Sequence, residues 1–99
     1  MSAEPRAVIL TFPTTHALLA AERELAEEGW AIEVIPVPVG IASDCGFCVR
    51  RIPGARRPAD KADNEFLDIA AALRCDGIWT ERTLADAETG REVRLYERR

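Results

Sequence analysis

The first third of the chain alternates a short apolar segment with a longer amphipathic one. Residues 7–12 form a nearly continuous apolar run, which is typical of a central strand covered on at least one face. Pro13 ends this run, and Thr14 or Thr15 can cap the helix that follows. Along that helix, which is predicted to extend to Glu28, leucine and alanine share one face and the acidic residues lie mostly elsewhere. This pattern indicates a helix packed on a core.

The two predicted helices are expected to end in the same way. Gly29 follows the first helix, and a left-handed glycine there would let Trp30 fold back onto the last turn. Gly77 is expected to play the same part after the second helix, whose apolar positions precede it at helical spacing. Asp60 or Asp63 can cap the start of this second helix.

The remaining apolar segments predict strands. They fall at residues 31–37, 46–52 and 78–84, and the charged segment 91–99 alternates well enough for one more strand at a sheet edge. Two successive strand–helix–strand units of this kind predict one domain over residues 1–99. The expected fold is α/β (α+β): a ferredoxin-like βαββαβ sandwich, with two helices on one face of a four- to five-stranded sheet.

The net charge of −4 disfavours a general nucleic-acid binder, but the charge is unevenly distributed. Four arginines and one aspartate between residues 41 and 57 give that segment +3, which leaves −7 for the rest of the chain. A basic patch on an acidic body favours an anion or an acidic partner over a nucleic-acid duplex.

The sequence also predicts a cytoplasmic protein with no membrane association. No apolar run approaches the length of a membrane-spanning helix, and the N-terminal residues show no cleavage pattern. Three cysteines, an odd number, then favour reduced thiols over a disulfide framework.

The segment around Cys45 carries the candidate chemistry. Pro36 and Pro38 stiffen the exit from the preceding strand. Gly46 allows unusual backbone angles, and Ser43 can hydrogen-bond nearby backbone groups. Together these residues predict a tight turn that presents the Cys45 side chain to solvent.

Positive neighbours would activate such a thiol. A cysteine is a nucleophile only as the thiolate, which nearby arginines favour. Arg50 and Arg51 follow Cys45 closely, whereas Asp44 opposes them. His16 can approach the same loop, because both segments follow strand ends where sites often gather. We therefore expect Cys45 to face water within a field of guanidinium groups.

The other two cysteines have less distinctive surroundings. Cys48 would lie within a strand, where it can pack as a small apolar group or reach Cys45 as a second, resolving thiol. Cys75 is expected to have only a packing role near the end of the second helix. One Cys-x-x-Cys pair supplies only two of the four ligands of structural zinc, and His16 is the sole histidine. We predict no cofactor and no metal, although a dimer could bring two pairs together.

The sequence between residues 7 and 52 resembles the selenium/sulfur carrier-like family, which is also described as a domain of unknown function. The family shows a strand-to-helix start, a glutamate in the first helix, an Ile-Pro-x-Pro strand end and a Ser-x-Cys-Gly turn. The matching residues here are Phe12, Thr14, Thr15 and Ala17, then Glu22, then Ile35, Pro36 and Pro38, then Ser43, Cys45 and Gly46. The resemblance implies a persulfide or perselenide carrier with Cys45 as the carrier thiol. Cys48 departs from the family, whose members commonly carry an apolar residue there.

The resemblance also implies partners: sulfur or selenium donor and acceptor proteins of the cysteine desulfurase or sulfurtransferase type. Substrate or partner binding would fall to residues around the thiol, namely Ser43, Gly46, Arg50, Arg51 and His16. Any enzymatic activity would be at most that of a sulfurtransferase-type carrier or a thiol oxidoreductase. Two alternatives remain open: a thiol–disulfide redox protein that uses Cys45 and Cys48, and a non-catalytic interaction module or homodimer.

Overall fold

The computed structural model describes residues 7–52, 54–62 and 64–99 of the chain. Along the described residues the elements are β1 (Val8–Thr11), α1 (Thr15–Glu28), β2 (Glu33–Pro36), β3 (Phe47–Arg51), α2 (Glu65–Ala72), β4 (Gly77–Ala85) and β5 (Glu92–Arg98). The prediction of a mixed fold with two helices and up to five strands is confirmed. No helix within these ranges combines the length and the apolar character needed to cross a membrane.

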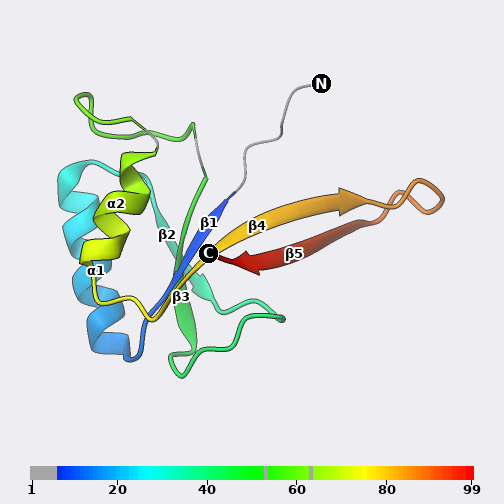
Figure 1. The fold of residues 1–99 in the computed structure, drawn as a ribbon, viewed down its shortest axis with the longest axis horizontal. Coiled ribbons are helices and arrows are strands. Elements are labelled where there is room, and N and C mark those ends of the chain that lie inside the picture. The colour runs from blue at the N-terminus through cyan, green and yellow to red at the C-terminus, as the bar shows by residue number, and fades with distance from the viewer. Residues whose placement is uncertain (1–6, 53, 63) are drawn as a thin grey trace.

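The five strands form one sheet in the order β2-β3-β1-β4-β5, and each strand is antiparallel to its neighbours. Figure 1 shows both helices at one side of this sheet. Strand β1 lies in the middle, which explains its almost uninterrupted apolar sequence: all four of its residues are buried.

Consecutive strand residues point to opposite faces, so the sheet has two apolar clusters. The helix-side core is the larger one and consists of Val8, Leu10, Phe12, Leu18, Ala21, Leu25, Trp30, Cys45, Val49, Phe66 and Ala70. The loop-side core lies on the other face and consists of Ile9, Ile41 and Cys48, with Ile35, Val37, Trp79 and Tyr96 packed around them. The segment 37–46 between β2 and β3 supplies Val37 and Ile41 to this second cluster.

Helix α1 begins and ends as its sequence predicts. The Thr14 hydroxyl accepts a hydrogen bond from the Ala17 amide at 3.1 Å, which caps the first turn. Gly29 has a left-handed φ of 99°, and the Trp30 amide donates to the Leu25 carbonyl at 3.1 Å. This end of the helix carries Trp30 into the helix-side core.

Helix α2 does not follow the predicted pattern. It ends at Ala72, and the extended backbone of Leu73 terminates it. The N-cap position is Asn64, which makes no side-chain capping bond, so Asp60 is not the cap; Asp63 lies outside the described residues. Gly77 does not cap this helix either. It is already the first residue of β4, and its φ is not positive.

Close packing explains a glycine at position 77. A β-carbon there would lie 2.8 Å from both the Thr11 hydroxyl oxygen and the Trp79 indole nitrogen. The Thr11 hydroxyl is buried and held by a 2.6 Å hydrogen bond to the Asp76 carboxylate. The neighbouring side chains therefore leave no room for a larger residue.

The β4–β5 hairpin reaches well beyond the rest of the sheet (Figure 1). Strand β1 pairs only with Gly77–Thr80, whereas β5 pairs with β4 from Trp79 to Ala85. The far half of the hairpin is thus a two-stranded arm without a helix against it.

The packing at Gly77 yields a stability prediction. Gly77→Ala is expected to lower the free energy of unfolding by about 1–3 kcal/mol, because the methyl group must displace Thr11 or Trp79. Gly46→Ala is the matched control: no heavy atom lies within 4 Å of its β-carbon position, and the change should stay within about 0.5 kcal/mol. Urea unfolding of both variants measures the difference, and equal midpoints would contradict this account of Gly77.

Candidate functional site

Cys45 lies at the end of the segment between β2 and β3, and it is buried. Its exposed fraction is 4%, and it packs in the helix-side core. The expectation that this side chain faces water is therefore wrong. The turn does form, but the segment folds so that residue 45 turns inward beneath α1 and the polar residue before it stays nearer the surface.

The nearest polar group to the Cys45 sulfur belongs to helix α1. The Thr15 hydroxyl oxygen and the Cys45 sulfur are 3.7 Å apart, and either group can donate the hydrogen bond. Thr15 is the first residue of α1, where backbone N–H groups have no partner within the helix. The sulfur thus lies next to the positive end of a fourteen-residue helix. The sequence predicts Thr15 as a possible cap and as part of the family's strand-to-helix start, but not as a neighbour of Cys45.

The segment that leads to Cys45 has few backbone hydrogen bonds. The Val37 amide donates to the Gly46 carbonyl at 3.1 Å, and the Ile41 amide donates to the Pro38 carbonyl at 3.2 Å. Gly40 supplies the left-handed angle of this turn, with φ of 102°, whereas Gly46 does not have a positive φ. The Ser43 hydroxyl is buried, and among the described residues it has no hydrogen-bond partner.

Arg50 does not contribute to the surroundings of Cys45. Its guanidinium group donates to the Glu33 and Glu81 carboxylates, at 2.9 Å each, on the face of the sheet away from the helices. The hydrogen bonds that Arg50 donates to Glu81 raise the pKa of Arg50, despite its partial burial. Burial alone would raise the pKa of Glu81, but the hydrogen bonds and the charge of Arg50 outweigh it and lower that pKa. The network ends at Tyr96, whose hydroxyl donates to Glu81 at 3.2 Å.

Arg51 is almost completely buried, with an exposed fraction of 1%. Its guanidinium carbon lies 4.7 Å from the centre of the Trp30 ring and 5.3 Å from that of Phe66. Such cation–π contacts join β3 to α2 and to the segment after α1. The predicted field of guanidinium groups around Cys45 is therefore wrong: Arg50 and Arg51 point to opposite faces of β3, and internal partners hold both.

Cys48 occupies the loop-side core and is completely buried. Burial raises its pKa to about 11, with a further rise from nearby Cys45 and an opposing effect of Arg50. Its thiol lies 4.0 Å from the Pro36 carbonyl oxygen. Cys45 and Cys48 thus belong to separate apolar clusters on opposite faces of the sheet, and both are free thiols.

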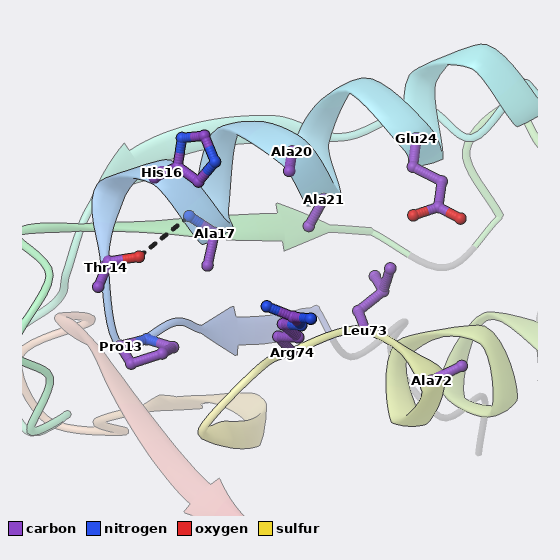
Figure 2. Close-up of a pocket in the computed structure, with 10 residues that line it drawn as sticks. All are labelled: Pro13, Thr14, His16, Ala17, Ala20, Ala21, Glu24, Ala72, Leu73 and Arg74. Atoms are coloured by element: carbon purple, nitrogen blue, oxygen red, sulfur yellow. Dashed lines mark hydrogen bonds between the residues drawn. The ribbon is translucent and has the colours of Figure 1, made fainter.

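His16 lines a groove between the two helices (Figure 2). The groove has a volume of about 500 Å³, alanines form much of its wall, and Arg74 lies at the α2 side. A second groove on α1 also includes His16, together with Leu19. Neither of these two grooves is lined by a cysteine, so neither of them brings His16 and Cys45 together.

Cys75 lies after the end of α2, half-buried. Its thiol donates to the Ala70 carbonyl at 3.3 Å, and burial raises its pKa. Within the described ranges, no three histidine, cysteine, aspartate or glutamate side chains are grouped in a way that could hold a metal ion.

The part of the chain that carries Cys45 matches the model of one protein family. The chain belongs to the family described as "Putative Se/S carrier protein-like", whose model it matches over residues 7–58, just over half of its length. The match extends from β1 through β3 and includes both Cys45 and Cys48. No curated protein and no solved structure gave a significant match.

The Arg50–Glu81 pair yields a pH-dependent stability prediction. Glu81→Gln is expected to lower the free energy of unfolding by about 1–3 kcal/mol at about pH 7, because it leaves a half-buried guanidinium poorly compensated. The pKa of Glu81 is lower in the folded protein than its ordinary 4.5, so this stabilisation is present above that value and is lost as the pH falls through the folded pKa. Urea unfolding should therefore show a smaller difference in free energy of unfolding between wild type and Glu81→Gln at about pH 3 than at about pH 7.

The control for Glu81 is Glu97→Gln. Glu97 forms a comparable 2.9 Å ion pair with Arg82, but the side chains of both residues are exposed. The change is therefore expected to lower the free energy of unfolding by less than about 1 kcal/mol. A difference in free energy of unfolding between wild type and Glu81→Gln that is equally large at both pH values would contradict the electrostatic explanation.

The surroundings of Cys48 predict its reactivity. With a pKa of about 11, on the order of one Cys48 thiol in a thousand is ionised at about pH 8, and the side chain is also inaccessible. Iodoacetamide should therefore modify Cys48 only when the protein opens, whereas the partly exposed Cys75 should react sooner. Peptide mass spectrometry after timed quenching measures both rates. Equal rates in the folded protein would show that the loop-side core does not protect this thiol.

Proposed function

We propose that this protein is a small cytoplasmic carrier of sulfur or selenium and that Cys45 is its carrier thiol. The observation that supports this most directly is the place of Cys45 within the family-matching region, 3.7 Å from the Thr15 hydroxyl at the start of α1. A helix N-terminus favours negative charge, and both a thiolate and a persulfide anion are negatively charged sulfur species. Among the three cysteines, Cys45 alone combines this position with the family's Ser-x-Cys-Gly turn.

The proposed transfer step is an exchange at sulfur. The Cys45 thiolate attacks the terminal sulfur of a donor protein's persulfide, and a new S–S bond forms at Cys45. The donor's own S–S bond breaks, its electron pair leaves with the donor cysteine as a thiolate, and the attacked sulfur remains on Cys45 as a persulfide. Delivery repeats the exchange with an acceptor thiolate. No external oxidant or reductant is needed, and a selenium atom can follow the same path.

Burial of Cys45 gives this carrier a specific requirement: the segment 37–46 must open for loading and close afterwards. Its few backbone hydrogen bonds and the fully exposed Val39 at its tip support such a motion. Once closed, the helix-side core would shield a bound persulfide from small thiols in solution. The buried, unpartnered Ser43 hydroxyl would then be available to the added atom.

The remaining assignments follow from this proposal. The partners would be donor and acceptor proteins of the cysteine desulfurase or sulfurtransferase type, which dock near the Cys45 segment. Gly46, at the end of that segment, and His16, in the first turn of α1, are both exposed and stay candidates for partner contact. Arg50 and Arg51 are better explained as structural cations of β3. The strand order supports a ferredoxin-like βαββαβ core extended at one edge by β5.

A thiol–disulfide redox cycle of Cys45 with Cys48 receives no such support. The two residues lie in clusters on opposite faces of the sheet, and the raised pKa of Cys48 suppresses the thiolate that would attack Cys45. A resolving role would need β3 to rearrange.

Mass spectrometry after incubation with a cysteine desulfurase and cysteine tests the carrier. Wild type should gain the mass of one sulfur atom, and so should the matched controls Cys48→Ser and Cys75→Ser. Cys45→Ser should gain none. Circular dichroism establishes that each variant is folded before loading. An adduct on no thiol, or one that persists in Cys45→Ser, would refute the assignment.

A further inference from the structure

Strand β5 presents an open edge. Among the strands of the described residues it is the last in the sheet order, with β4 as its one neighbour. The Arg99 amide donates to the Ile78 carbonyl, and the Asp86 amide donates to the Arg91 carbonyl, so odd-numbered positions of β5 bond to β4. Because the backbone direction alternates along a strand, the N–H and C=O groups of Glu92, Arg94, Tyr96 and Arg98 point away from the sheet.

An apolar patch accompanies this edge. Leu84, Val93 and Leu95 are 47%, 51% and 43% exposed. Leu84 is paired with Val93, and Leu95 lies two residues further along the same strand, so the three side chains share one face of the hairpin arm. An unpaired backbone edge with exposed apolar side chains beside it is characteristic of an edge to which another strand can be added.

We propose that a second copy of this chain pairs with this edge. The two β5 strands pair antiparallel about a two-fold axis at Leu95, and the two five-stranded sheets become one continuous sheet. Each outward-facing residue of β5 then exchanges backbone hydrogen bonds with the second copy. The interface is the same patch on both chains, as two-fold symmetry requires.

The sequence of β5 is complementary to itself in this register. Glu92 lies opposite Arg98 of the second copy, and the symmetric pair repeats the contact. Arg94 lies opposite Tyr96, whose hydroxyl bond to Glu81 holds its ring in place as a surface for a guanidinium group. On the other face Leu95 meets Leu95 of the second copy, with Val93 diagonal to it.

Neighbouring registers are disfavoured by charge. A shift in one direction places Arg94 opposite Arg94 of the second copy, and a shift in the other places Arg94 opposite Arg98. Like charges directly opposite each other destabilise a strand pair. The charges on this edge therefore discourage unspecific pairing, as the sequence suggested, while they permit one symmetric register.

Arg98 is compatible with this role. It donates to the Asp76 carbonyl at 2.9 Å, and its guanidinium carbon lies 5.8 Å from the centre of the Trp79 ring. These contacts place the side chain on the face that Glu92, Arg94 and Tyr96 share, and it remains exposed there.

Sedimentation equilibrium across a range of concentrations tests the dimer. Wild type should be in monomer–dimer equilibrium or fully dimeric. Arg94→Pro removes an outward N–H without loss of a bond to β4, so it should fold and be monomeric. A wild type that stays monomeric at all concentrations tested would overturn the proposal. A dimer that persists in folded Arg94→Pro would place the interface elsewhere and also overturn it.

Charge reversal tests the register and does not depend on a proline variant. Glu92→Arg alone and Arg98→Glu alone should each raise the dimer dissociation constant roughly tenfold or more, because two symmetric pairs become repulsive. The two single variants mixed together should form a heterodimer, since each supplies the charge that the other lacks. The double variant should dimerise as wild type does. Glu88→Arg, a matched reversal in the exposed hairpin turn, should change nothing.

Single reversals without effect on a confirmed dimer, or a mixture that stays monomeric, would refute the register. None of these measurements depends on Cys45, so the outcome is independent of the proposed carrier function.

Discussion

The alternation of side chains across β3 decides the surroundings of Cys48, Arg50 and Arg51. Both faces of the central strands are covered, one by the helices and one by the segment 37–46, so a side chain on either face meets an apolar cluster. Cys48 and Arg50 point to the loop side, and Val49 and Arg51 point to the helix side. A cluster of cysteines and arginines that is compact in sequence is therefore divided in space.

The division gives the two arginines different structural tasks. Arg51 occupies a core position that a large apolar side chain usually fills. Its guanidinium group packs against the Trp30 and Phe66 rings, which joins the helix side to the sheet. Arg50 connects β2 to β4 through Glu33 and Glu81, across the central strand β1. Internal partners hold both side chains, and the positive N-terminus of α1 lies beside the Cys45 sulfur.

The proposed transfer chemistry and the proposed dimer contact fall in different parts of the chain. The family-matching region ends before α2 and contains Thr15 and the segment 37–46 with Cys45. The proposed dimer edge belongs to β5, at the opposite end of the sequence and outside that region. Because β5 lies at one edge of the sheet and β2 at the other, pairing through β5 leaves the β2–β3 end open to a donor or acceptor protein.

The sequence by itself determined local elements such as α1. Its hydrophobic periodicity, the Thr14 cap and the left-handed Gly29 depend only on neighbouring residues, and the structure confirms them. It also identified the turn at Cys45 and the edge strand at the C-terminal end. Only the tertiary structure decided which way that turn faces, because this depends on the distant start of α1. The same holds for Gly77, whose reason is the Thr11 side chain sixty-six residues away in sequence, and for Arg50, whose partner Glu81 lies two strands over. Contacts of such separation leave no periodic signal in one sequence, since pairing and packing create them only when the sheet forms.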